Sequence, residues 1–252
     1  MKVVSFVLWL LCLIPASVSA QVRPHDAGDG SVLVISSYFP FKESGNRIIA
    51  SFTETFAGQS ARPIVVEYMD SEAASEFDGW REWMYSLFEV YVHRPAVIVI
   101  FGNEAWLAYR ACYPERWADV PVVLGGVTNA VINSEDHAER SVRSVGDLTP
   151  TRLTFGSLQV TGYSIRDYFA ENLALIRRLE PGATQVACIY DDRYQLGFFR
   201  SYIDSLARQA GFSNLHYWSG AALSTSDLID SVTRTGDPCA LLMLGWYTDA
   251  DR

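Results

Sequence analysis

The sequence lacks the motifs that would assign a chemistry. Its 252 residues contain no Gly-x-Ser-x-Gly nucleophile elbow, no phosphate-binding loop and no dinucleotide fingerprint. The four histidines are scattered along the chain and belong to no recognisable motif. They are His25, His93, His137 and His216. We therefore expect no catalytic residue, no bound metal and no cofactor in this chain.

The sequence also has no concentration of positive charge. The formal net charge is -9 and no stretch is densely basic, which argues against nucleic acid as a partner. There are no internal repeats and no low-complexity linkers. A hydrophobic fraction of 49% suits one or two globular domains with a sizeable buried core.

Cysteine is scarce. Cys12 lies in an apolar N-terminal run, and the other three cysteines, Cys112, Cys188 and Cys239, are widely spaced. Their odd number excludes a full disulfide framework, and their spacing matches no metal site. We expect these three cysteines to be small buried residues in core helices or strands. One disulfide between Cys188 and Cys239, on two nearby strands, is the alternative.

Residues 1–20 have the pattern of a secretory signal peptide. Lys2 precedes the apolar run Val3–Pro15, and small residues follow at Val18 and Ala20. The run is shorter than the roughly 20 apolar residues that a membrane-spanning helix needs. We therefore expect a periplasmic or other extracytoplasmic location, with an uncleaved anchor as the alternative.

Strand-like and helix-like segments alternate along the rest of the chain. Continuous apolar or β-branched runs, typical of parallel strands covered on both faces, occupy 31–36, 63–68, 96–101, 120–124, 185–190, 215–219 and 239–244. Helical patterns fill the gaps at 43–56, 75–91, 104–113, 165–179, 193–210 and 226–235. This alternation predicts right-handed crossovers and an α/β fold with doubly wound parallel sheets.

The alternation breaks once. Residues 129–155 are polar and poorly periodic, and Val160-Thr-Gly162 leads into a new helical pattern. We interpret the polar segment as a loop on the rim of a first lobe, followed by a crossing into a second lobe. The expected limits are 31–158 for the N-terminal α/β lobe and 162–252 for the second.

Small, polar and aromatic residues follow the predicted strands, where ligands bind in open α/β sheets. These endings are Ser36–Pro40, Met69–Glu72, Gly102–Glu104, Gly125–Thr128, Asp191–Tyr194 and Gly245–Thr248. Glycine lets a ligand approach the backbone, and Asn103 and Thr128 can hydrogen-bond at a helix N-terminus. Tyr38, Tyr194 and Trp246 can stack on a planar or sugar-like ligand. We expect the endings to form one cleft.

Each residue also has a purely structural interpretation. Asn103 can be an N-cap, and Glu104 can be a first-turn carboxylate that favours the helix dipole. Asp191-Asp192 can be a turn and helix cap.

The order of several segments resembles the extracytoplasmic sensor region of hybrid two-component histidine kinases of Bacteroidetes. The segments are VLVISSYFPF…NRIIASFTETF, VVEYMDSE, RPAVIVIFGNEAWLAY, VPVVLGGVT, VTGYSIRDYFAENLALIRRLEPGATQVACIYDD and CALLMLGWYTD. The resemblance covers about residues 31–250. That region is similar to the type I periplasmic-binding-protein fold and to the substrate-binding proteins of ABC transporters.

The resemblance implies two Rossmann-like lobes that close over a small ligand, with closure signalled across the membrane. The positions it places in the cleft are Ser37, Tyr38, Asn103, Glu104, Gly126, Asp192, Tyr194 and Trp246. It implies a small-molecule ligand, a homodimer through the receptor context and no enzymatic activity in this region. In the family the chain returns to the first lobe and continues into a membrane helix and kinase domains. Because the sequence stops at Arg252, we expect the second lobe or its return crossover to be truncated.

Three other functions fit parts of the sequence. A soluble substrate-binding protein of an ABC importer shares the fold and the cleft. An exported hydrolase would use Asp70, Glu104 or Asp192 as its acids. A non-functional remnant would lack a cooperative unfolding transition.

Overall fold

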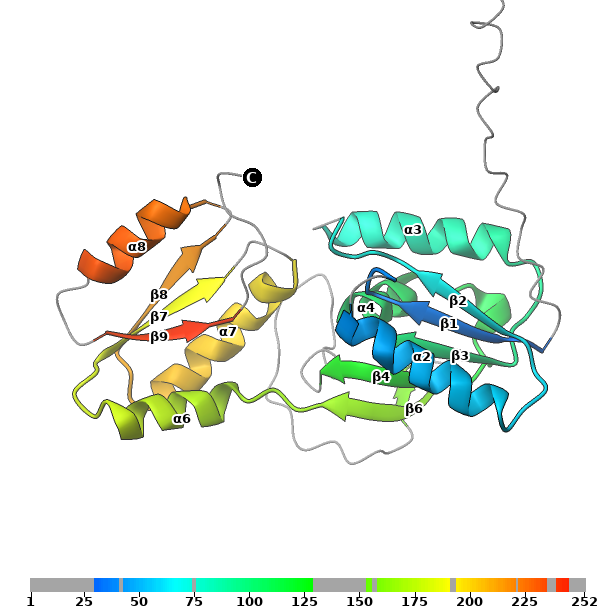
Figure 1. Ribbon diagram of the computed structural model, residues 1–252, viewed down its shortest axis with the longest axis horizontal. Coiled ribbons are helices and arrows are strands. Elements are labelled where there is room, and N and C mark those ends of the chain that lie inside the picture. Colours follow the sequence, from blue (N-terminus) through cyan, green and yellow to red (C-terminus); the bar gives the residue numbers. More distant parts are fainter. Residues whose placement is uncertain are drawn as a thin grey trace, which may run out of the picture.

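The structure, a computed structural model, contains two sheets in two separate α/β units (Figure 1). The strand order is β2-β1-β3-β4-β6-β5 in the first sheet and β8-β7-β9 in the second. The described residues are 30–40, 43–73, 76–128, 153–155, 158–190, 194–220, 222–234 and 239–244. The predicted signal peptide, 1–20, lies outside them. Within these ranges, no helix combines the length and the apolar character needed to cross a membrane.

The first sheet is parallel except at one edge. Its strands are β1 (Val32–Ser36), β2 (Ile64–Tyr68), β3 (Val97–Phe101), β4 (Val122–Thr128), β5 (Leu153–Phe155) and β6 (Leu158–Ile165). Only β5 is antiparallel to its neighbour, β6. Every residue of β1 is buried, as expected for a central strand covered on both faces.

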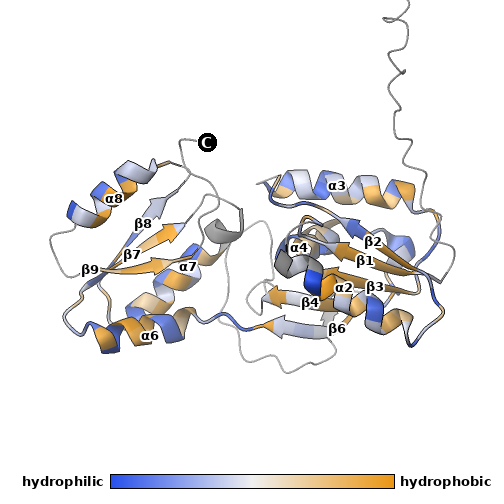
Figure 2. Cartoon of the chain, viewed as in Figure 1, coloured by the Kyte–Doolittle hydropathy of each residue, from blue (hydrophilic) through white to orange (hydrophobic). Residues whose placement is uncertain are grey.

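Helices cover both faces of the first sheet. They are α2 (Glu43–Ala57), α3 (Phe77–Val90) and α4 (Asn103–Cys112), followed by the short 3-10 helix η2 (Glu115–Trp117). Successive side chains of a strand point to opposite faces, so β1 contributes to two cores. Val32 and Val34 belong to the core on the α2 side with Ile49, whereas Leu33 and Ile35 belong to the core that includes α3 and α4. Figure 2 shows the corresponding hydrophobic colour along β1 and β3.

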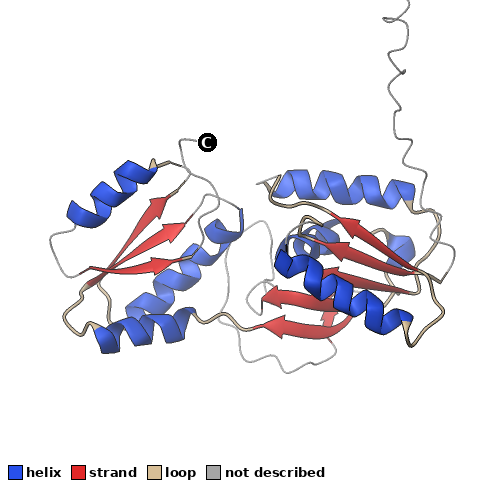
Figure 3. Ribbon diagram, in the orientation of Figure 1, coloured by secondary structure: helices blue, strands red, loops and turns tan. Residues whose placement is uncertain are grey.

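The second unit repeats the same architecture on a smaller scale (Figure 3). Its strands are β7 (Gln185–Tyr190), β8 (Asn214–Ser219) and β9 (Cys239–Met243), all parallel, and its helices are α6 (Phe169–Leu179), α7 (Tyr194–Gln209) and α8 (Thr225–Arg234). Val186 and Cys188 of β7 are fully buried and share a core with Ile203 of α7. The two parallel sheets confirm the predicted α/β fold.

Two strands were not predicted. Strand β5 lies in the segment expected to be a loop, and β6 continues to Ile165, where we expected a helix that in fact begins at Phe169. Strand β6 has a weak sequence signal because its outer positions are exposed and Gly162 interrupts its apolar residues. The predicted lobe limits, 31–158 and 162–252, stay predictions, although strand pairing of the first sheet extends to Ile165.

The alternative disulfide is wrong. The described cysteines, Cys112, Cys188 and Cys239, are all free. On the paired strands β7 and β9, Cys188 lies opposite Leu242, whereas Cys239 lies opposite Gln185. Three residues of offset separate the two Cα atoms by about 10 Å, beyond the roughly 7 Å limit for a disulfide.

Candidate functional site

Gly102 brings the ends of β1 and β3 together. Its backbone has φ +95°, and a Cβ there would lie 2.5 Å from Ser37 Oγ and 3.3 Å from Tyr38 Cζ. Its N–H also donates to the Gly125 carbonyl, 3.1 Å away, at the end of β4. Only glycine fits this conformation and this spacing, so the predicted residues Ser37, Tyr38 and Gly102 do lie against one another.

Ser37 joins three segments of the first unit. Its buried Oγ accepts a hydrogen bond from the backbone N–H of Ala105 in the first turn of α4, at 2.9 Å. Its own N–H donates to the Phe101 carbonyl and its carbonyl accepts from the N–H of Ser71, both at 2.8 Å. The helix begins after Gly102, which has no side chain to satisfy the free N–H groups. Ser37 therefore supplies the missing cap from a neighbouring strand.

Asn103 bridges β3 and β4. Its Oδ1 accepts from the backbone N–H of Thr128 at 2.8 Å and from the Thr128 hydroxyl at 3.3 Å. Because a backbone N–H can only donate, the oxygen must face Thr128 and the Nδ2 group is left as a donor. No described residue accepts from Nδ2, and the residue is half-buried. Asn103 is not the N-cap; Gly102 is, and α4 has no side-chain cap bond from it.

Gly126 lies inside β4 and not after it. The pairing of β4 with β6 skips Gly126, which forms a bulge with φ +68°. Among the described residues, a Cβ there would meet Ile165 Cδ1 at 3.9 Å and the Gly102 nitrogen at 4.0 Å. The bulge therefore presents its backbone beside Gly102, and its contacts with the described residues are no closer than ordinary van der Waals distance.

Two carboxylates border this region. Glu104 is half-buried in the first turn of α4. Asp70 has a left-handed φ of +49°, and the residues on either side of it, Met69 and Ser71, donate backbone N–H bonds to the carbonyls of Ser36 and Ser37. This loop is thus held beside the end of β1. Among the described residues, no group of three or more His, Cys, Asp or Glu is placed to hold a metal ion.

The contribution of the second unit stays a prediction. Asp192 and Trp246 lie outside the described residues, and Tyr194 begins α7 with a side chain that is not described. The arrowheads of β3 and β4 in one unit and of β7 and β9 in the other point toward each other in Figure 1. The carboxyl ends of both sheets thus face the region between the units, as the cleft hypothesis requires.

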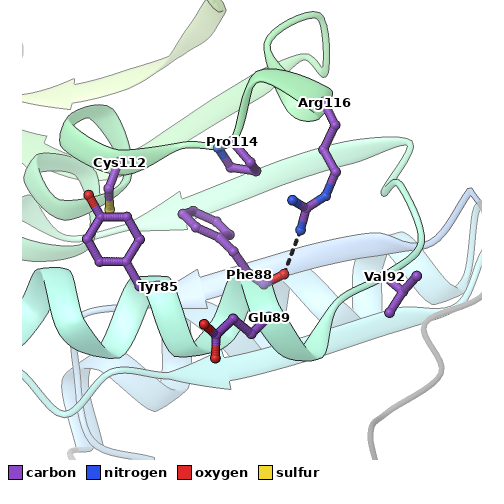
Figure 4. A pocket seen from close by; sticks show the side chains of 7 residues that line it. All are labelled: Tyr85, Phe88, Glu89, Val92, Cys112, Pro114 and Arg116. Carbon is purple, nitrogen blue, oxygen red and sulfur yellow. Dashed lines mark hydrogen bonds between the residues drawn. The ribbon is translucent and has the colours of Figure 1, made fainter.

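A second feature, a groove on the first unit, was missed by sequence reasoning. It has a volume of about 650 Å³ and is lined by Tyr85, Phe88, Glu89, Val92, Cys112, Pro114 and Arg116 (Figure 4). We call it the α3 groove. Its residues come from two segments, 85–92 and 112–116, that are 20 positions apart at their nearest ends, so no local pattern could have revealed it.

No family model matches the sequence, and no curated protein matches it. A crystal structure of an ABC domain in complex with L-Trp from Streptococcus pneumonia is similar, with 14% identity and a TM-score of 0.53, over 84% of this chain and 64% of that one. An extracellular ligand-binding receptor from Rhodopseudomonas palustris HaA2 has 14% identity and a TM-score of 0.48, over 86% and 55%.

The chain spans less than two thirds of the length of each of these proteins. At 14% identity the similarity concerns the fold alone. The chain has an α/β fold of parallel-sheet, Rossmann-like units of the type I periplasmic-binding-protein kind.

Proposed function

We propose that the chain binds a small molecule between its two α/β units and serves as the extracytoplasmic sensor domain of a two-component histidine kinase receptor. The binding proposal rests on one observation: at the carboxyl ends of β1, β3 and β4, four predicted residues lie together. They are Ser37, Gly102, Asn103 and Gly126. Ligands of open α/β sheets bind at this edge. The L-Trp held by the structurally similar ABC domain supports a ligand of small size.

The chemistry of these residues suits recognition better than catalysis. The close partner of the Ser37 hydroxyl is the N–H of Ala105, and no base in the described part of the chain bonds that hydroxyl to activate it as a nucleophile. Asn103 offers an amide donor, and the backbone is open to close approach at Gly126. We infer a ligand with a hydrogen-bond acceptor, such as a carbonyl, carboxylate or sugar oxygen, that stays chemically unchanged.

The receptor role rests on the resemblance of the ordered segments from residue 31 to 250, and an extracytoplasmic location rests on the signal-like residues 1–20. An ABC-importer substrate-binding protein is the second candidate, favoured by the similarity to the streptococcal ABC domain. Both roles need the same ligand site. The neighbouring genes distinguish them: transporter subunits favour an importer, and kinase and receiver segments favour a receptor.

A thermal-shift screen of the chain without residues 1–20 tests ligand binding. Amino acids including L-Trp, sugars, nucleosides and small anions are added at millimolar concentration. A ligand at 100 times its Kd stabilises the native state by about 2.7 kcal/mol, which raises Tm by roughly 5–10 °C. The matched variant is Asn103→Asp, which keeps the acceptor for Thr128 but removes the Nδ2 donor.

We expect one class of compound to raise the Tm of the wild-type chain and to raise that of the variant much less. The absence of any shift, or equal shifts in both proteins, would contradict a site at the strand ends.

A further inference from the structure

Ile165 borders the candidate ligand site, a position that its sequence pattern did not predict. It is the last residue of β6 and lies opposite Thr128, the residue that bonds to Asn103. Its Cδ1 atom is 3.9 Å from the position that a Cβ at Gly126 would take, and that position is 4.0 Å from the Gly102 nitrogen. Figure 1 shows β4 and β6 side by side, with both arrowheads directed toward the second unit. An aliphatic side chain, an amide and two glycines therefore lie together at the strand ends.

The bulge in β4 sets this arrangement. Beyond the bulge, Thr128 lies opposite Ile165. The register that precedes the bulge, continued without the extra residue, would place Val127 opposite Ile165. Bulges beside functional sites often re-aim a side chain in this way. The extra residue thus brings Ile165 level with the bond that holds the Asn103 amide.

Ile165 contributes little to the core of the first unit. It is 49% exposed, whereas Leu158 and Val160 of the same strand are almost fully buried and belong to the core. Single exposed isoleucines are common on protein surfaces, so exposure alone indicates no function. The position of Ile165 is what matters, because its side chain ends beside the bulge, where a ligand can approach the backbone. A ligand bound there would cover apolar surface that the fold leaves in water, which favours binding.

The other neighbours add to the apolar character of this region. Arg166, the residue after Ile165, donates through Nη2 to the Glu171 carboxylate of α6, so its charge is paired within the second unit. The Tyr38 ring lies against Gly102, with Cζ 3.3 Å from the position that a Cβ there would take. The two glycines are therefore bordered by an aromatic ring and an aliphatic side chain.

We propose that Ile165 determines the specificity of the candidate site, by selecting ligands that carry an apolar group next to the acceptor that Asn103 binds. This inference rests on the proposed binding of a small molecule at the strand ends, and it narrows the class of that molecule. Small organic acids, amides and amino acids with an aliphatic or aromatic group meet both requirements. Polyols and inorganic anions meet only one, because they have acceptors but no apolar group to cover Ile165.

Matched pairs of compounds test the inference in the thermal-shift assay of the chain without residues 1–20. The two members of a pair share an acceptor and differ in an apolar group: glycine with L-leucine, and acetate with phenylacetate. The apolar member of at least one pair should raise the Tm at a concentration where its polar partner does not.

Titration calorimetry with both members of that pair then tests Ile165 itself. Ile165→Ala should raise the Kd of the apolar member by about 5- to 30-fold and change that of the polar member much less, whereas a merely structural effect would weaken both equally. Ile165→Val removes only the carbon nearest Gly126 and keeps the β-branched strand residue, so it should fold and give a smaller increase. The control Ile229→Ala, at a 57% exposed position of α8, should leave both Kd values unchanged.

Equal Kd values for the wild type and Ile165→Ala, or equal Tm shifts with the two members of every pair, overturn the inference. So does a polyol or an inorganic anion as the tightest ligand of the wider screen. If Asn103→Asp still abolishes the Tm shift in these cases, the ligand site stands and only the role of Ile165 is wrong. If no compound shifts the Tm at all, the proposed ligand site is wrong and this inference falls with it.

Discussion

Replacing Gly102 by alanine should destabilise the first α/β unit. Gly102 has φ +95° and ψ 160°, a region of backbone conformation that is essentially restricted to glycine. The added Cβ would lie 2.5 Å from Ser37 Oγ and 2.7 Å from Ser37 Cβ, so Ser37 would have to move. That movement would break the 2.9 Å bond from the Ala105 N–H to Ser37 Oγ.

The two effects set the expected magnitude. Holding alanine in a glycine-only conformation costs about 1–3 kcal/mol, and loss of a helix cap costs about 0.5–2 kcal/mol. We therefore expect Gly102→Ala to lower the free energy of unfolding by about 2–5 kcal/mol. For a chain of this size the corresponding fall in Tm is roughly 5–15 °C.

Urea unfolding followed by tryptophan fluorescence measures this change, because Trp80, Trp106 and Trp117 are buried in the first unit. The matched control is Gly58→Ala in the same unit. A Cβ at Gly58 would make ordinary contacts, 3.5 Å from the Thr55 carbonyl oxygen, and Gly58 has no left-handed φ. Both substitutions reduce the conformational entropy of the unfolded chain equally. The difference between their free energies of unfolding therefore measures the cost of the added Cβ in the native state.

An unfolding free energy for Gly102→Ala within about 0.5 kcal/mol of that for Gly58→Ala would refute the reasoning. It would mean that the end of β3 can relax away from Ser37, and that the close packing of these strand ends does not define the site.

Asn103→Asp should preserve stability, since Oδ1 still accepts from Thr128. It should raise the Kd of the ligand by about 10- to 100-fold, because the Nδ2 donor is lost, and titration calorimetry would measure this change. Arg177→Lys should lower the free energy of unfolding by about 1.5–3 kcal/mol in urea, because the guanidinium donates to four backbone carbonyls and lies 4.0 Å from the Phe212 ring centroid. The exposed control Arg178→Lys should change it little. Burial raises the pKa of the Cys188 thiol to about 12 from its ordinary value near 9, so its alkylation, followed by mass spectrometry, should be slow at pH 8 until the chain unfolds. Since only the unfolded thiol ionises between these values, the contribution of Cys188 to stability should be constant below about pH 9 and should be lost as the pH rises toward 12.

Much of the fold could be predicted because buried parallel strands have a strong local signal. The apolar run at 185–190 forms β7 with the same limits, and the run at 31–36 forms β1 one residue shorter. Helix α4 was predicted from Glu104 and begins one residue earlier. These elements are apolar on the surfaces they bury, so composition and periodicity suffice to find them.

Strands β5 and β6 could not be predicted in the same way. In β6, Leu158 and Val160 are buried whereas Gln159 and Thr161 are exposed, and the strand depends on pairing with β4. That pairing requires Gly162, where a Cβ would lie 2.1 Å from the Leu124 carbonyl oxygen. A contact between strands so far apart along the chain is a tertiary feature without a local pattern.

The candidate site was predicted in part. The glycines after β3 and in β4 indicated close backbone approach, and Gly102 and Gly126 do lie near each other. The bond between Asn103 and Thr128 joins residues 25 positions apart and follows from the adjacency of β3 and β4. The cap that Ser37 provides to α4 likewise depends on the order of the strands in the sheet. The sequence therefore suggested a ligand-binding role for Ser37, whereas the structure also shows that Ser37 caps the N-terminus of α4.

A crystal structure of the chain with the compound that raises its Tm most is the most direct test of the central claim. The account predicts a ligand acceptor about 3 Å from Asn103 Nδ2, with ligand atoms in contact with the backbone at Gly126 and with residues of the second unit. A ligand bound away from the carboxyl ends of β1, β3 and β4, in the α3 groove for example, would contradict it.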